Sequence, residues 1–155
     1  MIIPETSQLI TLAFITIVPW IELRGSIPYG IGMGFDTWFV FLFVLIFNLL
    51  IIPITYYGLE IFYTRFFIRF KICRTLVERV RNKGEKYIRK YGIPGLIIFV
   101  GIPLPGTGAY SGTILAWLFG MKKFEAFVSI AIGVLIAAVC VMLFSVGFFN
   151  YSIFS

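Results

Sequence analysis

The sequence ELRGSIPYG (residues 22–30) places two opposite charges, Glu22 and Arg24, inside an otherwise apolar part of the chain. The sequence GIPLPGTGAYSG (residues 101–112) is uncharged and is also rich in glycine and proline. A proline inside a helix removes a backbone hydrogen bond and clashes with the preceding turn. Each stretch is therefore predicted to interrupt a helix with an irregular elbow.

The composition indicates an integral membrane protein. Hydrophobic residues make up 60% of the 155 residues and charged residues only 13%, against about 25% in a typical soluble domain. A chain this short cannot bury so much apolar surface within itself. A helix needs roughly 20 apolar residues to cross a bilayer, and residues 37–62 and 124–150 are each long enough. We expect a single all-α membrane domain, residues 1–155, with transmembrane helices in these two ranges.

Residues 1–35 and 92–121, which precede the two spans, are apolar but broken by glycine and proline. Irregular backbone at membrane depth is tolerated only where protein or a water-filled cavity surrounds it. We therefore predict two re-entrant helical hairpins, so that the chain contains two inverted repeats of a hairpin and a span. Such repeats are common in secondary transporters. A spanning course of the broken ranges is the alternative, and it would move Lys122 and Lys123 outside.

The positive charge is concentrated in one segment. Ten of the thirteen Lys and Arg residues lie between Arg65 and Lys90, which predicts a multi-pass plasma-membrane protein with residues 63–91 cytoplasmic and both termini outside. Gly84 is expected to end or break the helix in this segment. Anionic lipid headgroups are its expected partner. We expect the segment to act as an anchor and orientation signal, with headgroup recognition linked to transport as the alternative. Apolar residues at helical spacing predict a basic amphipathic cytoplasmic helix in the membrane interface: Phe66, Phe70, Cys73, Val77 and Val80.

Glu22 and Arg24 are the residues most suited to chemistry. Charges at membrane depth are costly, so they usually pair or line a cavity. Ser26 is predicted to cap the next half-helix, with Pro28 in its first turn. A helix N-terminus beside an arginine is an anion site, and arginine grips phosphate in a forked geometry.

The second elbow offers Thr107 or Ser111 as a helix cap, so that two helix N-termini would converge on one midplane site. The alternatives are an interfacial charge pair outside the hydrocarbon and an elbow that serves packing alone. Asn48 is expected to form an interhelical hydrogen bond. The residues predicted to bind substrate or couple ions are Glu22, Arg24, Gly25, Ser26, Pro28, Tyr29, Pro103, Pro105, Gly106, Thr107, Gly108, Tyr110 and Ser111.

Features of common enzymes are missing from the sequence. There is no histidine for a catalytic triad or a metal site, and no P-loop. Cys73 and Cys140 lie in segments of different kinds, so neither a disulfide nor a metal site is expected. We expect no enzyme activity, no nucleic-acid partner and no cofactor apart from a coupling proton or sodium ion.

The two elbow motifs together resemble the small multidrug export protein family of bacteria and archaea, over nearly the whole chain. The layout also resembles the wider DedA-like superfamily. That resemblance implies two facing re-entrant hairpins, each followed by a span, and in some members the flipping of polyprenyl phosphate or phospholipid driven by a cation gradient. Glu22 matches the acidic residue near the first hairpin of DedA proteins. The arginines of their second half are absent near Pro105.

The leading hypothesis is a secondary transporter for a small amphipathic anion such as a lipid phosphate. Arg24 and the two helix N-termini would hold the anionic head, and Glu22 would bind a proton or sodium ion. The first alternative is export of small cationic drugs by proton exchange at Glu22. The second is a membrane scaffold without transport. Because the chain is small, we expect a homodimer or a larger assembly.

Overall fold

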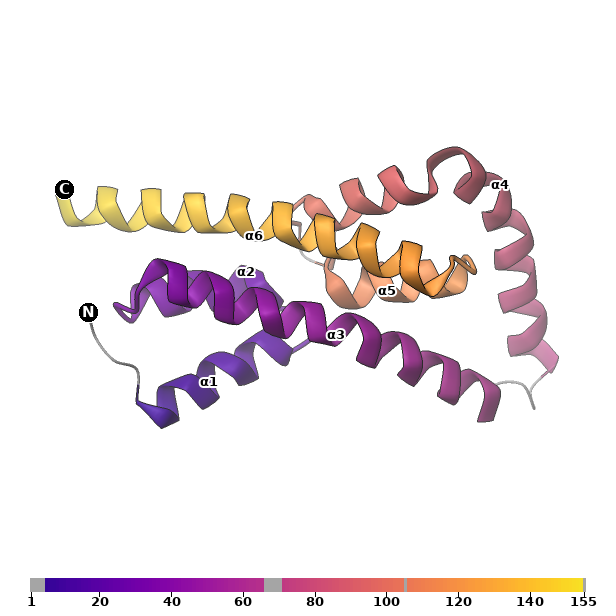
Figure 1. The fold of residues 1–155 in the computed structure, drawn as a ribbon, viewed down its shortest axis with the longest axis horizontal. Helices are drawn as coiled ribbons and strands as arrows, with labels where there is room; N and C mark the ends of the chain where they lie inside the picture. The colour runs from indigo at the N-terminus through magenta and orange to yellow at the C-terminus, as the bar shows by residue number, and fades with distance from the viewer. Residues whose placement is uncertain (1–4, 66–70, 105, 155) are drawn as a thin grey trace.

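The structure is a computed structural model that describes residues 5–65, 71–104 and 106–154. This part of the chain is helical and has no strands. Figure 1 shows its six helices in order. Their bounds are α1 Thr6–Ile17, α2 Glu22–Gly32, α3 Thr37–Arg65, α4 Lys71–Gly101, α5 Ala109–Leu118 and α6 Lys123–Phe154.

Two helices are long and apolar enough to cross a membrane. They are α3 and the Lys123–Phe149 part of α6, with mean hydropathies of 2.6 and 2.9. At a rise of about 1.5 Å per residue, α3 extends about 44 Å, which exceeds a hydrocarbon core of about 30 Å. Many large apolar side chains on both helices face outward, as lipid contact requires. The two helices contain the predicted spans and extend a few residues beyond them.

The first hairpin consists of α1 and α2, which lie side by side and are joined by residues 18–21 (Figure 1). The helix is interrupted before the ELRGSIPYG motif, because α2 already begins at Glu22. Pro28 therefore lies in the interior of α2. The sequence had predicted a helix that begins after Ser26, with Pro28 in its first turn. The chain then turns at Gly34, whose φ of 81° suits a residue without a Cβ, and enters α3.

The second hairpin consists of the last turns of α4 and the whole of α5, joined by residues 102–108. Helix α4 passes through Pro94 and ends only at Gly101. It also continues through Gly84, which was expected to end or break it. Figure 1 shows the change of direction within α4. The basic segment and the first arm of the second hairpin are thus parts of one helix. Phe66 and Phe70 of the predicted apolar face lie outside the described residues.

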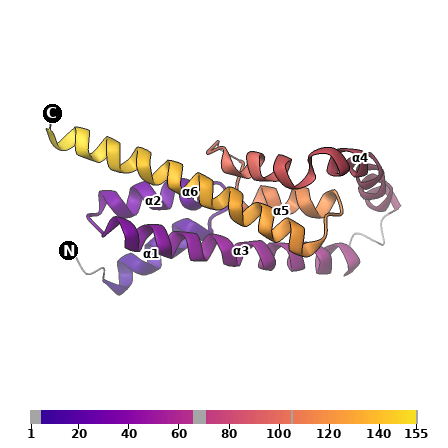
Figure 2. The ribbon, with the colours of Figure 1, turned by 45° about the horizontal axis from the view of Figure 1, so that its top comes forward.

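The two hairpins meet end to end in the middle of the molecule. Figures 1 and 2 show the 18–21 connection beside the 102–108 connection, with α1 and α2 extending toward one end and α5 toward the other. Helices α3 and α6 run in opposite directions, and the start of α1 lies at the same end of the molecule as the end of α6.

The core between the hairpins and the long helices is close-packed. Gly133 of α6 lies against α4, and an added Cβ there would come within 2.7 Å of the Val100 Cβ. Small residues at such contacts let membrane helices approach closely. Asn48 is fully buried on α3, but its Nδ2 donates to the Val44 carbonyl of the same helix at 3.0 Å. Within the described residues, Asn48 therefore does not form the predicted interhelical bond.

Candidate functional site

The Glu22 carboxylate caps a helix that lies far away in sequence. Its Oε2 accepts the backbone N–H of Ala109 at 3.3 Å, and its Oε1 accepts that of Tyr110 at 3.2 Å. These N–H groups belong to the first turn of α5, where no intrahelical acceptor exists and the helix carries partial positive charge. Glu22 is only 4% exposed. The acidic residue of the first hairpin therefore closes the N-terminus of the second hairpin's half-helix.

The backbone around Glu22 is unusual. Its φ of 46° lies in the left-handed region, which residues with a side chain seldom adopt. Such strain is concentrated at functional sites. The Ser26 hydroxyl donates to the Glu22 carbonyl at 2.5 Å and accepts from the Thr16 hydroxyl at 2.9 Å. Ser26 was predicted to cap α2, but it lies one turn inside the helix and links α2 to α1 instead.

Arg24 contacts the second connection as well. Its Nη2 donates to the Thr107 Oγ1 at 2.7 Å and to the Ile102 carbonyl at 3.3 Å. The Thr107 hydroxyl itself donates to the carbonyls of Ile102 and Leu104, which shapes the connection. The Arg24 Nε is buried and has no hydrogen-bond partner among the described residues. Because a guanidinium has five N–H donors, Arg24 retains donors for a ligand.

A third link runs in the opposite direction. The Tyr110 hydroxyl donates to the Ile17 carbonyl at the end of α1, at 2.7 Å. The Gly108 N–H donates to the Ser111 Oγ at 2.8 Å, so Ser111 contributes to the predicted capping, while Thr107 does not. Glu22, Arg24 and Tyr110 therefore tie the two hairpins together. Glu22 binds the start of α5 and Arg24 binds the second connection, and the two side chains form no hydrogen bond with each other.

A cavity of about 320 Å³ opens at this junction. That volume is at the lower end of the range for small-ligand sites. Trp20 provides a largely exposed aromatic wall, and the charges of Glu22 and Arg24 lie on the same cavity. The lining residues are Pro19, Trp20, Glu22, Arg24, Gly106, Gly108, Tyr110, Ser111 and Ile114.

The cavity gathers about half of the predicted site residues. Six of them line it: Glu22, Arg24, Gly106, Gly108, Tyr110 and Ser111. Thr107 holds Arg24. Pro103 lies in the exposed connection, and Pro105 lies outside the described residues. Their part in binding stays a prediction. Four others lie within α2 and do not line the cavity: Gly25, Ser26, Pro28 and Tyr29.

Sequence reasoning missed three lining residues, Pro19, Trp20 and Ile114. Trp20 was not among the predicted site residues. Pro19 and the charged Glu22 together indicate a helix break, and this signal could have pointed to Trp20, which lies between them. No group of three or more metal-binding side chains is present among the described residues.

A family model described as "Putative small multi-drug export protein" matches residues 22–140. The chain belongs to this family. The matched range begins at Glu22. It contains the two charged residues Glu22 and Arg24, the whole second connection and more than half of α6. No curated protein and no solved structure matches the chain at a significant level. Membership, together with two apolar helices of spanning length, indicates a membrane protein of the export or transport type.

Proposed function

We propose that this export-family protein is a secondary transporter for an amphipathic anion, most simply a lipid phosphate such as polyprenyl phosphate. The observation that carries the proposal is the Glu22 carboxylate seated on the N-terminus of α5, beside Arg24 and an open cavity. An anion-binding helix end, a guanidinium and an aromatic wall together suit a charged head on an apolar body.

Arg24 would hold the anionic head. One of its nitrogens is held by Thr107, which fixes the direction of the guanidinium. The other guanidinium N–H groups of Arg24, which lines the cavity, would supply charge-assisted donors for a phosphate oxygen. A fork of this kind suits phosphate better than the point charge of lysine does.

Glu22 would couple transport to an ion gradient. Its ionised form occupies the N–H groups of Ala109 and Tyr110. A proton or a sodium ion on the carboxylate would remove the charge that the helix end stabilises. These N–H groups would then be available to the substrate's own anionic head. Cation binding and substrate binding would thereby favour each other at one place.

The arrangement of the elements supports two inverted repeats. The hairpins point in opposite directions, and so do α3 and α6 (Figure 1). In a bilayer both hairpins would be re-entrant, with the basic segment cytoplasmic and both termini outside. Alternating exposure would come from one half rocking against the other about the links at Glu22, Arg24 and Tyr110. A homodimer is the proposed working unit, because one such chain offers little surface to enclose a pathway.

Export of a small cationic drug is the second candidate. The description of the family favours it, and so do the aromatic side chains of Trp20 and Tyr110 on the cavity, because aromatic faces attract cations. In this case Glu22 would exchange a proton for the drug, and Arg24 would not be needed for binding.

Native mass spectrometry of the full-length protein in mild detergent, with added polyprenyl phosphate, separates the candidates. Wild type is expected to retain the lipid phosphate, and the Arg24→Ala variant is expected to lose it. Lys122→Ala is the matched control, because Lys122 is 84% exposed and lies outside the cavity. Equal retention by wild type and Arg24→Ala would rule out Arg24 as the residue that binds the anionic head. A cationic dye bound by Arg24→Ala but not by Glu22→Gln would favour drug export.

A further inference from the structure

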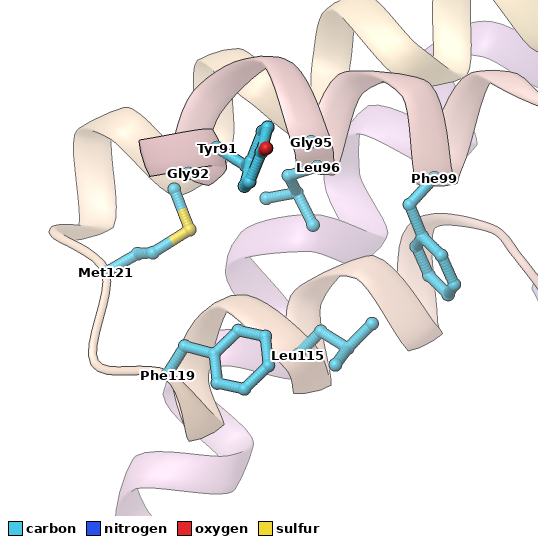
Figure 3. A pocket seen from close by; sticks show the side chains of 8 residues that line it. All are labelled: Tyr91, Gly92, Gly95, Leu96, Phe99, Leu115, Phe119 and Met121. Atoms are coloured by element: carbon cyan, nitrogen blue, oxygen red, sulfur yellow. The ribbon is translucent and has the colours of Figure 1, made fainter. Parts of the chain in front are cut away.

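A second cavity lies between α4 and α5 and shares no lining residue with the site of Glu22 and Arg24. Its volume is about 200 Å³. Figure 3 shows Leu96 of α4 opposite Leu115 of α5 and Phe119 just after α5, with the Met121 side chain reaching in from the turn before α6. None of its lining residues is charged: Tyr91, Gly92, Gly95, Leu96, Phe99, Leu115, Phe119 and Met121.

The cavity lies near the basic end of α3. The Tyr56 hydroxyl donates to the carbonyl of Met121 at 3.0 Å. Tyr63, two residues before the final Arg65 of α3, contacts Trp117 at the end of α5, with ring centroids 5.1 Å apart. Tyrosine and tryptophan gather at the membrane–water interface. If Tyr63 and Trp117 lie at that interface, the Tyr91 end of the cavity would lie close to the lipid headgroups.

The chain that leads into the cavity is strongly basic. Residues 65–90 contain ten Lys and Arg residues against two Glu. Tyr91, the next residue, already lines the cavity, and it belongs to the same helix, α4, which changes direction but continues from Lys71 to Gly101. Polybasic segments next to a membrane attract anionic lipids. An apolar cavity beside such a segment matches the two parts of one anionic lipid.

We propose that the cavity between α4 and α5 holds an acyl chain of an anionic membrane lipid whose headgroup lies against the basic half of α4. The wholly uncharged lining suits an alkyl chain. From Tyr91 to Phe99 the cavity follows α4 for about 12 Å, from the interface toward the middle of the molecule. The acyl chain of a lipid in one leaflet also extends from the membrane interface toward the middle of the bilayer. The bound lipid would fix α4 to α5, whose N-terminus carries the Glu22 contact.

The test uses native mass spectrometry of the full-length protein with phosphatidylglycerol and phosphatidylcholine of identical acyl chains. Wild type is expected to retain phosphatidylglycerol preferentially. Leu115→Trp fills the cavity and is expected to lower this retention about tenfold, the effect of losing the burial of roughly two methylenes. The matched control is Ile132→Trp on α6, at a side chain 41% exposed and outside both cavities, which is expected to behave as wild type.

Arg24→Ala separates this lipid from a transported one. If that variant still retains phosphatidylglycerol while Leu115→Trp does not, the lipid occupies the α4–α5 cavity whatever the substrate is. If Arg24→Ala loses it while Leu115→Trp keeps it, the lipid sits in the proposed transport site and the inference is overturned. Equal retention of the two lipids by wild type also overturns it.

A measurement on the unmodified protein guards against misfolding of Leu115→Trp. Phosphatidylglycerol with a photoactivatable group on its acyl chain is cross-linked to wild type, and the adducts are located by peptide mass spectrometry. Adducts within residues 91–99 or 115–121 support the site. Adducts spread evenly over the outward faces of α3 and α6, with none in these two ranges, contradict it.

Discussion

The carboxylate of Glu22 accepts a hydrogen bond from the backbone N–H of Tyr110 at 3.2 Å, across 88 residues of chain. The same Tyr110 donates its hydroxyl to the carbonyl of Ile17, just before the first connection. The two interrupted helices are therefore joined in both directions at one point. A change in the charge of Glu22 acts directly on the start of α5.

Replacing Glu22 by Gln is expected to weaken this junction. An amide has one oxygen to accept N–H groups and carries no charge to balance the helix end. We expect the free energy of unfolding to fall by about 1 kcal/mol, typical of a lost helix cap, measured by thermal unfolding in detergent. Glu125→Gln, at the exposed start of α6, serves as the control. Substrate movement by Glu22→Gln should also no longer respond to an imposed proton gradient.

Replacing Gly108 by Ala tests the close approach of the Glu22 carboxylate. A Cβ at Gly108 would overlap the Glu22 carboxyl group. The φ of Gly108 is −162°, which any residue adopts, so the cost comes from the side chain alone. We expect a loss of about 1–3 kcal/mol. Gly58→Ala is the control: no atom lies within 4 Å of its added Cβ, so this helical position should gain up to about 1 kcal/mol.

The same clash can be isolated with a double variant. Gly108→Ala combined with Glu22→Ala should cost less than the sum of the two single changes, because the carboxylate that the added methyl group would strike is gone. Additive costs would show that Gly108 and Glu22 are not in contact.

Replacing Tyr110 by Phe removes one link and keeps the aromatic wall. The lost bond to the Ile17 carbonyl should lower the unfolding free energy by about 1 kcal/mol. Transport should persist, because neither charge is altered. Tyr29→Phe is the control, since the described part of the chain offers its hydroxyl no hydrogen bond. Complete loss of transport in a folded Tyr110→Phe protein would give this hydroxyl a direct role in substrate binding.

Replacing Arg24 by Lys keeps the charge and removes the fork. We expect about tenfold weaker binding of a lipid phosphate, measured by titration with native mass spectrometry. Arg65→Lys, on the exposed last residue of α3, should bind as wild type does. Unchanged affinity in Arg24→Lys would mean that the site senses only charge.

The all-helical fold and the two long apolar helices could be predicted from the sequence because local signals control them. Long apolar runs between charges define α3 and α6, and Pro–Gly clusters indicate two breaks. The exact position of the first break was missed, since α2 tolerates Pro28 in its interior. That proline removes one N–H donor but leaves the rest of the helix intact.

The candidate site was only partly predictable for a different reason. Glu22 and Arg24 stood out because charges are rare in apolar segments. Their partners Ala109, Tyr110 and Thr107 lie more than eighty residues away, and no local pattern indicates such a contact. The predicted cap, Ser26, had the right chemistry. It was displaced because α2 begins one turn earlier.

We propose that substrate crosses the membrane at the junction of Glu22, Arg24 and Tyr110. The most direct test reconstitutes the full-length protein in vesicles and follows movement of a fluorescent polyprenyl phosphate between leaflets under a proton gradient. Wild type should accelerate it above protein-free vesicles, Lys122→Ala should match wild type, and Arg24→Ala should be no faster than protein-free vesicles. Movement by Arg24→Ala as fast as by wild type would contradict the claim.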